Sequence, residues 1–441
     1  MNKKNIFFSV LLTAFFVTGN LVGAGILGLP VQAGFAGFVP CLAAVILVGF
    51  AMSYTAFVLG DEVIRTKKPK FHYPSLYQAY LGPVGKWLAV LAALVIYYGF
   101  LIAYLSGARA VIKELLNVNI PTQAVTVIFF IVVTALTIAN PRVLRDYTAV
   151  FVALLLISFL ALVFMGEKHI VPGRLSYMDW KFFPLTLPVM VTAFSFHVII
   201  PNVCGDMGWK KPVIFLSMVT GAVIGYLVTV LWVQVTLGIL PVEGVISISA
   251  AYRENLPSTV PLSEIIRSPQ FIRFSLFFAL MAIVTSYVTN GYGLMEFIDD
   301  LMSNYFRRSN KLIVILLSFL PPLAITLIYP DIFLTALDMA GAFGVAVLFG
   351  ILPCVIAIVR ARAARRAPVS AVVVFLIFLM IIVFKTGKET GMIKLTPGGR
   401  YEKYNFDHYV TRPPSDRDGR HSGGGRTKEK KSRAVKPVKN K

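Results

Sequence analysis

Four glycines and an asparagine interrupt the first apolar stretch of this sequence. Residues 19–30 read Gly-Asn-Leu-Val-Gly-Ala-Gly-Ile-Leu-Gly-Leu-Pro. Each glycine weakens a helix interior by up to about 1 kcal/mol. Unwound backbone at membrane depth is tolerated only where it is buried in protein or lines a cavity. The stretch therefore predicts a helix that is broken halfway across the bilayer, with peptide groups left free to bind a small solute.

A second irregular segment lies farther along the chain. Pro188 precedes the run Thr-Ala-Phe-Ser-Phe-His at residues 192–197, which leads to Pro201-Asn202. Two interrupted spans five apart predict halves related by an inverted repeat, whose breaks meet near the bilayer midplane. There the positive N-terminal end of a half-helix favours a carboxylate, and freed carbonyls favour an ammonium group or a cation. The ligand that this arrangement favours is a zwitterion.

Composition places the helices that carry these breaks in a membrane. Of the 441 residues, 57% are hydrophobic and only 14% are charged, which is too little polar surface for a soluble globule of this size. Apolar runs long enough to cross about 30 Å of hydrocarbon fall near residues 6–33, 38–60, 84–111, 121–139, 148–165, 186–204, 212–240, 271–295, 312–329, 332–358 and 369–384. We therefore predict an all-α integral membrane protein of about eleven transmembrane helices.

The spans group into a membrane domain over residues 1–384. One repeat covers about 6–165, a second covers about 186–358, and an extra span lies at 369–384. With the N-terminus in the cytoplasm, the cytoplasmic side of this domain has 18 Lys and Arg and the opposite side has eight. Because cytoplasmic loops carry the positive excess, we expect a cytoplasmic N-terminus. An odd number of spans then places the C-terminal tail outside.

That tail, residues 385–441, has 16 Lys and Arg against six Asp and Glu. Its glycine run, proline pair and lysine-rich end cannot bury a core, so we expect it to be disordered. We expect no nucleic-acid binding, because the end of the tail lacks interleaved aromatic residues and the tail should lie across the membrane from nucleic acid. A cytoplasmic tail would change the span count by one, and its charge would then suit an anionic lipid surface.

The sequence offers no motif for covalent chemistry. Cys41, Cys204 and Cys354 are scattered in or beside spans, with neither a disulfide framework nor the spacing of metal ligands. A nucleophile–base pair, a zinc motif and a phosphate loop are also lacking in the sequence. We therefore predict that the protein is not an enzyme and uses no metal and no cofactor. The sequence gives no sign of an obligate protein partner; the bilayer is the expected surrounding.

The glycine-rich stretch resembles the first-span signature of the amino acid, polyamine and organocation transporter superfamily. Three further segments are similar to the hydroxy and aromatic amino acid permease family, the bacterial tryptophan and tyrosine permeases: residues 193–202, residues 285–296, and the prolines at 321–322 with Tyr329-Pro330. The similarity covers roughly residues 6–384. It implies a leucine-transporter-like fold, a 5+5 inverted repeat with the first and sixth helices broken. It also implies import of an aromatic amino acid across a bacterial inner membrane with a cation, usually a proton in this family.

The resemblance also implies which residues bind the substrate. Asn20, Gly23, Ala24 and Gly25 match the unwound stretch of the first span, where backbone N–H groups would hold the carboxylate. Tyr104 lies where a third-span tyrosine commonly faces the substrate.

The second break and the eighth span complete this set. Ser195, Phe196 and His197 match the sixth-span break, where carbonyls would receive the ammonium group and aromatic faces the substrate side chain. Thr285 and Ser286 occupy the position that supplies hydroxyl ligands for sodium in sodium-driven relatives. The resemblance therefore leaves sodium open as the coupling ion.

Two ionisable side chains within predicted spans are candidates for ion coupling. Imidazole titrates near neutral pH, so His197 could line the site and exchange a proton; a structural role is the alternative. Asp338 departs from the family, which has a small residue there. At that depth a carboxylate must pair, bind a cation or stay protonated, which leaves a proton carrier and a salt-bridge partner both open. Arg109 lies near the end of its span and can snorkel to the interface.

Two other readings of the function remain open. A transporter of the same fold could carry another amino acid or a polyamine, with a proton or sodium as the coupling ion. A polyamine would call for extra acidic groups near the site, and only Asp338 is available. A membrane-embedded enzyme or a non-transporting sensor belongs to a different class. The sequence lacks the motifs that an enzyme would need. A sensor would need a folded soluble domain, which the sequence does not contain.

Overall fold

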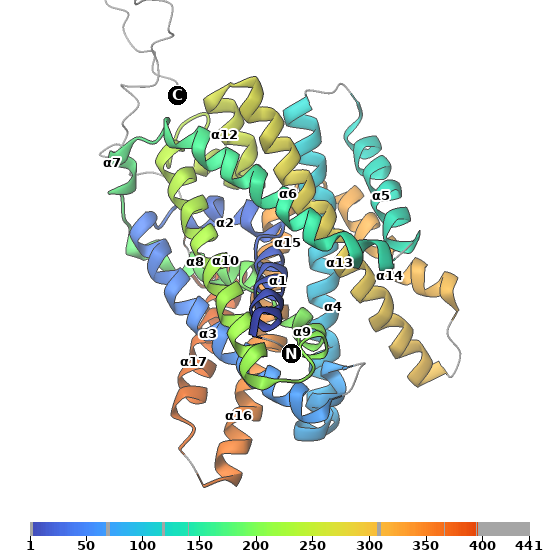
Figure 1. Ribbon diagram of the computed structural model, residues 1–441. Coiled ribbons are helices and arrows are strands. Elements are labelled where there is room, and N and C mark those ends of the chain that lie inside the picture. The colour runs from blue at the N-terminus through green and yellow to red at the C-terminus, as the bar shows by residue number, and fades with distance from the viewer. Residues whose placement is uncertain are drawn as a thin grey trace, which may run out of the picture.

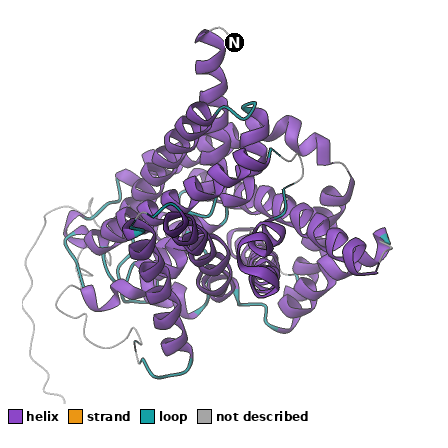
Figure 2. Cartoon of the chain, turned by 90° about the horizontal axis from the view of Figure 1, so that it is seen from below, coloured by secondary structure: helices purple, strands orange, loops and turns teal. Residues whose placement is uncertain are grey.

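The computed structural model describes residues 3–67, 71–116, 120–139, 141–306, 310–365, 367–393 and 395. Within these residues the backbone forms helices and loops, and its β-type contact is one isolated antiparallel bridge between Gly37 and Met178. Seen from below, the helices pack side by side and are joined mostly by short loops (Figure 2). The prediction of a disordered tail falls mostly on residues 396–441, which lie outside the described part of the chain.

The described residues contain eleven apolar spans when the bent first pair is counted as one. Figure 1 shows how their helices are arranged. The bent pair is α1 (Lys3–Leu21) and α2 (Gly25–Ala33), which meet at 53°. The remaining helices of the first half are α3 (Phe38–Thr66), α4 (Tyr73–Leu116), α5 (Thr122–Ala139) and α6 (Pro141–Glu167). This count confirms the predicted all-α membrane protein of about eleven helices.

The second half repeats this order. The sixth span contains α8 (Phe183–Ala193), the 3-10 turn η2 (His197–Ile199) and α9 (Ile200–Asp206). The seventh to eleventh spans are α10 (Lys211–Ile239), α13 (Pro269–Phe306), α14 (Lys311–Ile328), the composite span α15 (Phe333–Met339), η3 (Ala340–Ile351) and α16 (Leu352–Ala363), and α17 (Val369–Glu389). Short helices connect them: α7 (Pro172–Leu175), η1 (Trp180–Phe182), α11 (Ile248–Arg253) and α12 (Thr259–Ile266).

Both breaks predicted from the sequence are present, and they lie next to each other. α2 packs against α8, and a Cβ added at Gly25 would lie 3.3 Å from the Cα of Ala193. Glycine at the start of α2 and alanine at the end of α8 therefore let the two half-helices approach closely. Elsewhere α1 packs along α10, and α4 packs along α13. The result is an arrangement in which the first and sixth spans are both broken.

Several helices extend beyond the expected spans. A short helix that begins at Tyr73 precedes the third span; Gly82 adopts φ 67° and ψ −160° and breaks the helix there, so the span itself begins near residue 84 as expected. α17 continues to Glu389, beyond the expected end at residue 384. It does so because Lys385, which is only 2% exposed, has two carboxylate partners. The expected turn between the ninth and tenth spans is present between Ile328 and Phe333.

An ionic network joins three spans at one end of the bundle, and a tyrosine from α4 adds a hydrogen bond to it. Asp61 of α3 pairs with Lys211 of α10 and, at 2.9 Å, with Arg360 of α16. The next residue, Glu62, accepts hydrogen bonds from Arg360 at 2.7 Å and from the Tyr80 hydroxyl at 2.9 Å. Glu62 is 3% exposed, so these partners take the place of water around its carboxylate. The network fixes α3 to α16 across the two halves of the fold.

Replacing Arg360 with Met is therefore expected to destabilise the folded protein. Removing one partner leaves the buried Glu62 carboxylate without its cation, at a cost of about 3 kcal/mol. Thermal unfolding of the purified protein in detergent measures this loss. Arg362→Met is the matched control, because Arg362 is exposed and lies on the same helix. Equal unfolding temperatures for the two variants would contradict the proposed role of the network.

Candidate functional site

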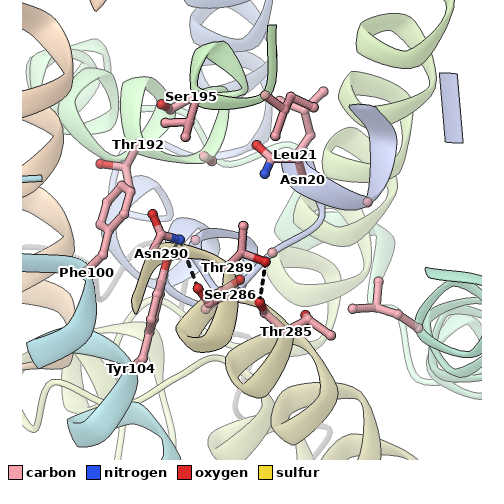
Figure 3. A pocket seen from close by; sticks show the side chains of 18 of the residues that line it. Asn20, Leu21, Phe100, Tyr104, Thr192, Ser195, Thr285, Ser286, Thr289 and Asn290 are labelled. Atoms are coloured by element: carbon pink, nitrogen blue, oxygen red, sulfur yellow. Dashed lines mark hydrogen bonds between the residues drawn. The ribbon is translucent and has the colours of Figure 1, made fainter. Parts of the chain in front are cut away.

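A cavity lies where the two breaks meet α4 and α13. It is lined by parts of α1, α2, α4, α6, α8 and α13, by the turns after α1 and α8, and by Leu337 of α15. Figure 3 shows polar side chains of α13 on one side and Asn20 and Ser195 of the two breaks on the other. The volume of the cavity is about 110 Å³. The breaks therefore do line a cavity, as the sequence predicts.

A side chain from another span satisfies the backbone at the first break. The amide of Val22 still donates to the carbonyl of Thr18 at 2.8 Å, but the amide of Ala24 donates to Ser286 Oγ at 3.1 Å. The helix resumes with Ile26 donating to the carbonyl of Gly23 at 3.1 Å. A Cβ at Gly23 would lie 2.7 Å from Ser286 Oγ. Glycine is needed here because α13 approaches the backbone so closely.

The second break leaves a helix C-terminus beside this N-terminus. The amide of Phe194 donates to the carbonyl of Met190 at 2.9 Å, and the amide of Ser195 donates to that of Thr192 at 3.3 Å. The last carbonyls of a helix and its first amides lack partners within the helix. The end of α8 therefore carries partial negative charge and the start of α2 partial positive charge. Both ends lie at the cavity.

The polar side chains of the lining are neutral. They are Asn20, Tyr104, Thr192, Ser195, Thr285, Ser286, Thr289 and Asn290. No Asp, Glu, Lys, Arg or His is among the described lining residues. The charges of a ligand would therefore be met by helix ends and hydrogen bonds. This environment suits a zwitterion better than a polycation.

Most hydroxyl protons on the α13 and α8 sides of the cavity are already used. Thr285 donates to the carbonyl of Met281 at 2.7 Å, and Thr289 donates to the carbonyl of Thr285 at 2.8 Å. Thr192 donates to the carbonyl of Leu337 at 2.8 Å. Asn290 Nδ2 donates to the carbonyl of Ser286 at 2.9 Å and to the Tyr104 hydroxyl at 3.4 Å. The hydrogen-bonding groups that remain free on this side are chiefly acceptors, namely oxygen lone pairs.

Aromatic rings form one wall of the cavity. Phe100 and Tyr104 both come from α4, with ring centroids 5.9 Å apart and planes tilted by 30°. Figure 3 shows both side chains on the same side of the open space, next to Asn290. Their spacing of four residues places them on one face of the helix. The wall offers a flat apolar surface beside a polar amide.

Most of the predicted site residues line the cavity. These are Asn20, Gly23, Ala24, Gly25, Tyr104, Ser195, Thr285 and Ser286. Phe100, Thr192, Thr289 and Asn290 also line it, although they are not among the predicted site residues. Thr289 and Asn290 follow Thr285 and Ser286 by four residues each, so helical spacing is a signal that could have identified them.

His197 and Phe196 lie outside the lining, in contrast to the sequence-based expectation. His197 is fully buried, and its Nε2 lies 3.0 Å from the Thr55 hydroxyl of α3. Its ring stacks on Phe349 of η3 at 5.0 Å. The turn after Ser195 directs the next two side chains into the packing between helices. The geometry therefore favours the structural alternative for His197.

Asp338 also lies outside the lining, in an ion pair. Its Oδ2 contacts Lys385 Nζ of α17, and Lys385 Nζ is 2.7 Å from Glu389 Oε1. The geometry thus places Asp338 as a salt-bridge partner, one residue from the cavity-lining Leu337. Arg109 pairs with Asp331, close to the start of the same span.

Comparison with solved structures identifies the fold. Crystal structures of two mutants of the manganese transporter of Eremococcus coleocola match this chain with a TM-score of 0.58 and 14% sequence identity. The match covers 88% of this chain and 89% of the other. At this identity the likeness concerns the fold alone. The eleven spans, the facing breaks and the cavity define a membrane transporter of the leucine-transporter-like fold.

Sequence comparison identifies the family. The model of the tryptophan/tyrosine permease family matches residues 6–389, and the chain belongs to this family. Tyrosine-specific transport system 2 of Haemophilus influenzae is 26% identical, over 75% of this chain and 82% of its own length. The low affinity tryptophan permease of Escherichia coli is 25% identical, over 83% of this chain and 89% of its own. The family resemblance seen in the sequence is confirmed.

Replacing Gly25 with Leu is expected to reduce uptake by at least about 100-fold, because the side chain would separate the two breaks and fill the cavity. Uptake of labelled substrate into liposomes measures this, and protease protection checks insertion. Gly205→Leu is the matched control, since a Cβ there meets nothing within 4 Å. If the Gly25 variant took up substrate as wild type does, the substrate would not bind at the first break.

Proposed function

We propose that this protein imports aromatic amino acids across the inner membrane by cation symport, with a proton as the coupling ion. The observation that carries this proposal is the pairing of opposite helix ends at one neutral cavity beside an aromatic wall. We further propose that the N-terminus is cytoplasmic, as the distribution of Lys and Arg favours. The names of the relatives support an aromatic substrate.

The backbone of the substrate would be bound at the two breaks. Its carboxylate would receive a hydrogen bond from the amide of Gly25, the first residue of α2, where the helix dipole favours an anion. Its ammonium group would donate to carbonyls at the end of α8 and at the end of α1, near Ser195 and Asn20. The lining provides no carboxylate for a second amine, which disfavours a polyamine.

The side chain of the substrate would lie against Phe100 and Tyr104. A flat ring gains both burial and favourable aromatic geometry on such a wall. Asn290 would set the preference among aromatic rings. Both of its N–H groups have acceptors, and its amide oxygen points into the cavity (Figure 3). That oxygen can accept a hydrogen bond from an indole N–H or a phenol O–H, but phenylalanine has none to offer.

Transport would proceed by alternating access. The bundle of α1 with α2, α3, α8 with α9, and α10 would rock against the remaining helices around the bound substrate. Coupling requires that substrate and ion together favour the occluded state more than either does alone. No covalent step is involved.

Sodium is the alternative coupling ion, and two hydroxyls favour it. Thr285 and Ser286 line the same cavity as the first break, and the hydroxyl oxygen of each keeps a lone pair. Oxygen ligands of this kind could hold a monovalent cation. Proton coupling and sodium coupling are therefore tested together.

Purified protein in liposomes is expected to accumulate labelled tryptophan or tyrosine when the outside is made acidic. We measure uptake of tryptophan, tyrosine and phenylalanine under an imposed proton gradient, a sodium gradient or neither. Unlabelled leucine and spermidine serve as competitors. Accumulation driven only by sodium would overturn the choice of ion. The choice of substrate would be overturned if the protein transported no aromatic amino acid but did transport another labelled compound, and if unlabelled leucine or spermidine reduced that uptake.

Replacing Asn290 with Ala is expected to lower tryptophan and tyrosine uptake relative to phenylalanine by about tenfold, the equivalent of one buried hydrogen bond. Competition assays measure the ratio of tryptophan or tyrosine uptake to phenylalanine uptake. A general loss of folding would lower all three and leave this ratio unchanged. Tryptophan methylated on the indole nitrogen is the matched ligand control. It should bind wild type poorly and lose nothing further in the variant. An unchanged ratio would show that Asn290 does not discriminate among the aromatic side chains of the substrates.

A further inference from the structure

The cavity extends from the two breaks toward one side of the membrane. With the N-terminus in the cytoplasm, as proposed above, its lining follows the cytoplasmic halves of three spans: Phe16 and Gly19 of α1, Phe151, Val152 and Leu155 of α6, and Val198 and Ile199 of η2. In α2 and α8, the outer halves of the broken spans, the lining is confined to Gly25, Thr192 and Ala193, next to the breaks. The outer side of the cavity is therefore closed in this structure.

The closure is made by α2 and α15, the outer parts of the first and tenth spans. The residues of α2 from Ile26 to Ala33 are all buried. A Cβ at Gly28 would lie 3.0 Å from both Leu334 and Leu337 of α15, so the two helices are in close contact above the cavity. In the proposed rocking motion α2 moves with the bundle, and α15 is one of the helices it moves against. This interface must separate before a substrate can enter from outside.

A buried hydrogen bond crosses the interface. Gln32 of α2 is 4% exposed, and its Nε2 donates to the carbonyl of Leu334 at 2.7 Å. Gln32 is the one polar side chain in the sequence of α2, so this bond favours one position of α2 on α15. When α2 moves away, water in the opened path can replace the lost partner. The bond can therefore stabilise the closed state and still be broken in each transport cycle.

The loop between the seventh and eighth spans bridges the same two helices at the surface. The amide of Ser258 donates to the Leu27 carbonyl of α2 at 2.8 Å. Asn255 Oδ1 accepts hydrogen bonds from the Thr335 amide of α15 at 3.1 Å and from its hydroxyl at 3.0 Å. Because Thr335 is exposed, water competes for this contact. The loop therefore adds less to the closure than the buried bond of Gln32.

Resting on the alternating access of the proposed function, we infer that α2 and α15 form the outer gate and that Gln32 is its latch. The hydrogen bond of Gln32 to Leu334 stabilises the state that is closed to the outside. Loss of this bond shifts the protein toward the state that is open to the outside. A methyl group added at Gly28 acts in the same direction, because it pushes α2 away from α15. Neither Gln32 nor Gly28 lines the cavity, so the substrate-binding groups are left in place.

A cysteine in the cavity can report which side is open. Thr289 is exposed and lines the cavity, and it belongs to neither helix of the gate. A small membrane-impermeant thiol reagent is added to the full-length Thr289→Cys protein in right-side-out or inside-out membrane vesicles, and the modification rate is measured from each side. The native cysteines Cys41, Cys204 and Cys354 are buried. Protein without the reporter gives their background in every variant.

We expect the reporter to react faster from the cytoplasmic side. Gln32→Met, which keeps a similar volume and removes the donor, should raise the rate from outside about fivefold, the equivalent of one hydrogen bond. Gly28→Ala should raise it as well. In both variants the cytoplasmic rate should fall by a smaller factor, because the two open states exclude each other and the outward one remains minor.

Two further variants serve as comparisons. Asn255 has φ 54°, and Asn255→Gly removes the acceptor while allowing this backbone angle. It should raise the outside rate by less than Gln32→Met does. Arg109→Met with Asp331→Asn is the matched control, because that ion pair joins α4 to the turn before α15 without contacting the bundle. Its two rates should equal those of the reporter protein alone.

Any of three results would contradict this inference. They are an outside rate that Gln32→Met leaves unchanged, rates that rise from both sides together, and a reporter that reacts faster from outside before the gate is altered. The labelling needs no transported substrate. A protein that shows the expected labelling but takes up no aromatic amino acid would contradict the proposed substrate and still establish the gate, so the two failures are distinguishable.

Discussion

Every peptide group inside a bilayer needs a hydrogen-bond partner from the protein, and the break between α1 and α2 makes that need acute. The structure meets it with Ser286, whose hydroxyl oxygen accepts from the amide of Ala24. This contact requires α13 to approach the backbone closely, which in turn requires glycine at position 23. The amide of Gly25 at the start of α2 is then available to a ligand. One satisfied group and its free neighbour together create the site.

The same constraint explains why the cavity is neutral. Helix ends supply partial charges that cost no desolvation of a full charge, so a zwitterion can be bound without a buried ion. Full charges are instead collected in compact groups away from the lining. Asp61 and Glu62 meet Arg360 at one end of the bundle, and Asp338 meets Lys385 in the tenth and eleventh spans. Substrate binding and charge pairing are thus separated in space.

The sequence was informative where local chemistry decides the structure. The cluster of glycines with Asn20 predicted the first break, and Pro188 with the run at residues 192–197 predicted the second, so most of the lining residues at the two breaks could be predicted. His197 could not be placed, because the direction of its side chain depends on the backbone angles of Phe194 to Phe196 after the break. The partner of Asp338 could not be found either. Lys385 lies 47 positions away, beyond the apolar run that marked the last span, and only the fold brings the two together.

The composite tenth span connects these separate features. Its first helix, α15, is bonded by Gln32 and Thr192, and the twelve-residue π-helix η3 follows directly. At Gly341 an added Cβ would lie 2.4 Å from the carbonyl of Pro188, so η3 and α8 are in backbone contact. The eleventh span, α17, packs on both. A helix outside the 5+5 repeat therefore touches elements that surround the cavity, and its buried Lys385 pairs with Asp338 of the tenth span.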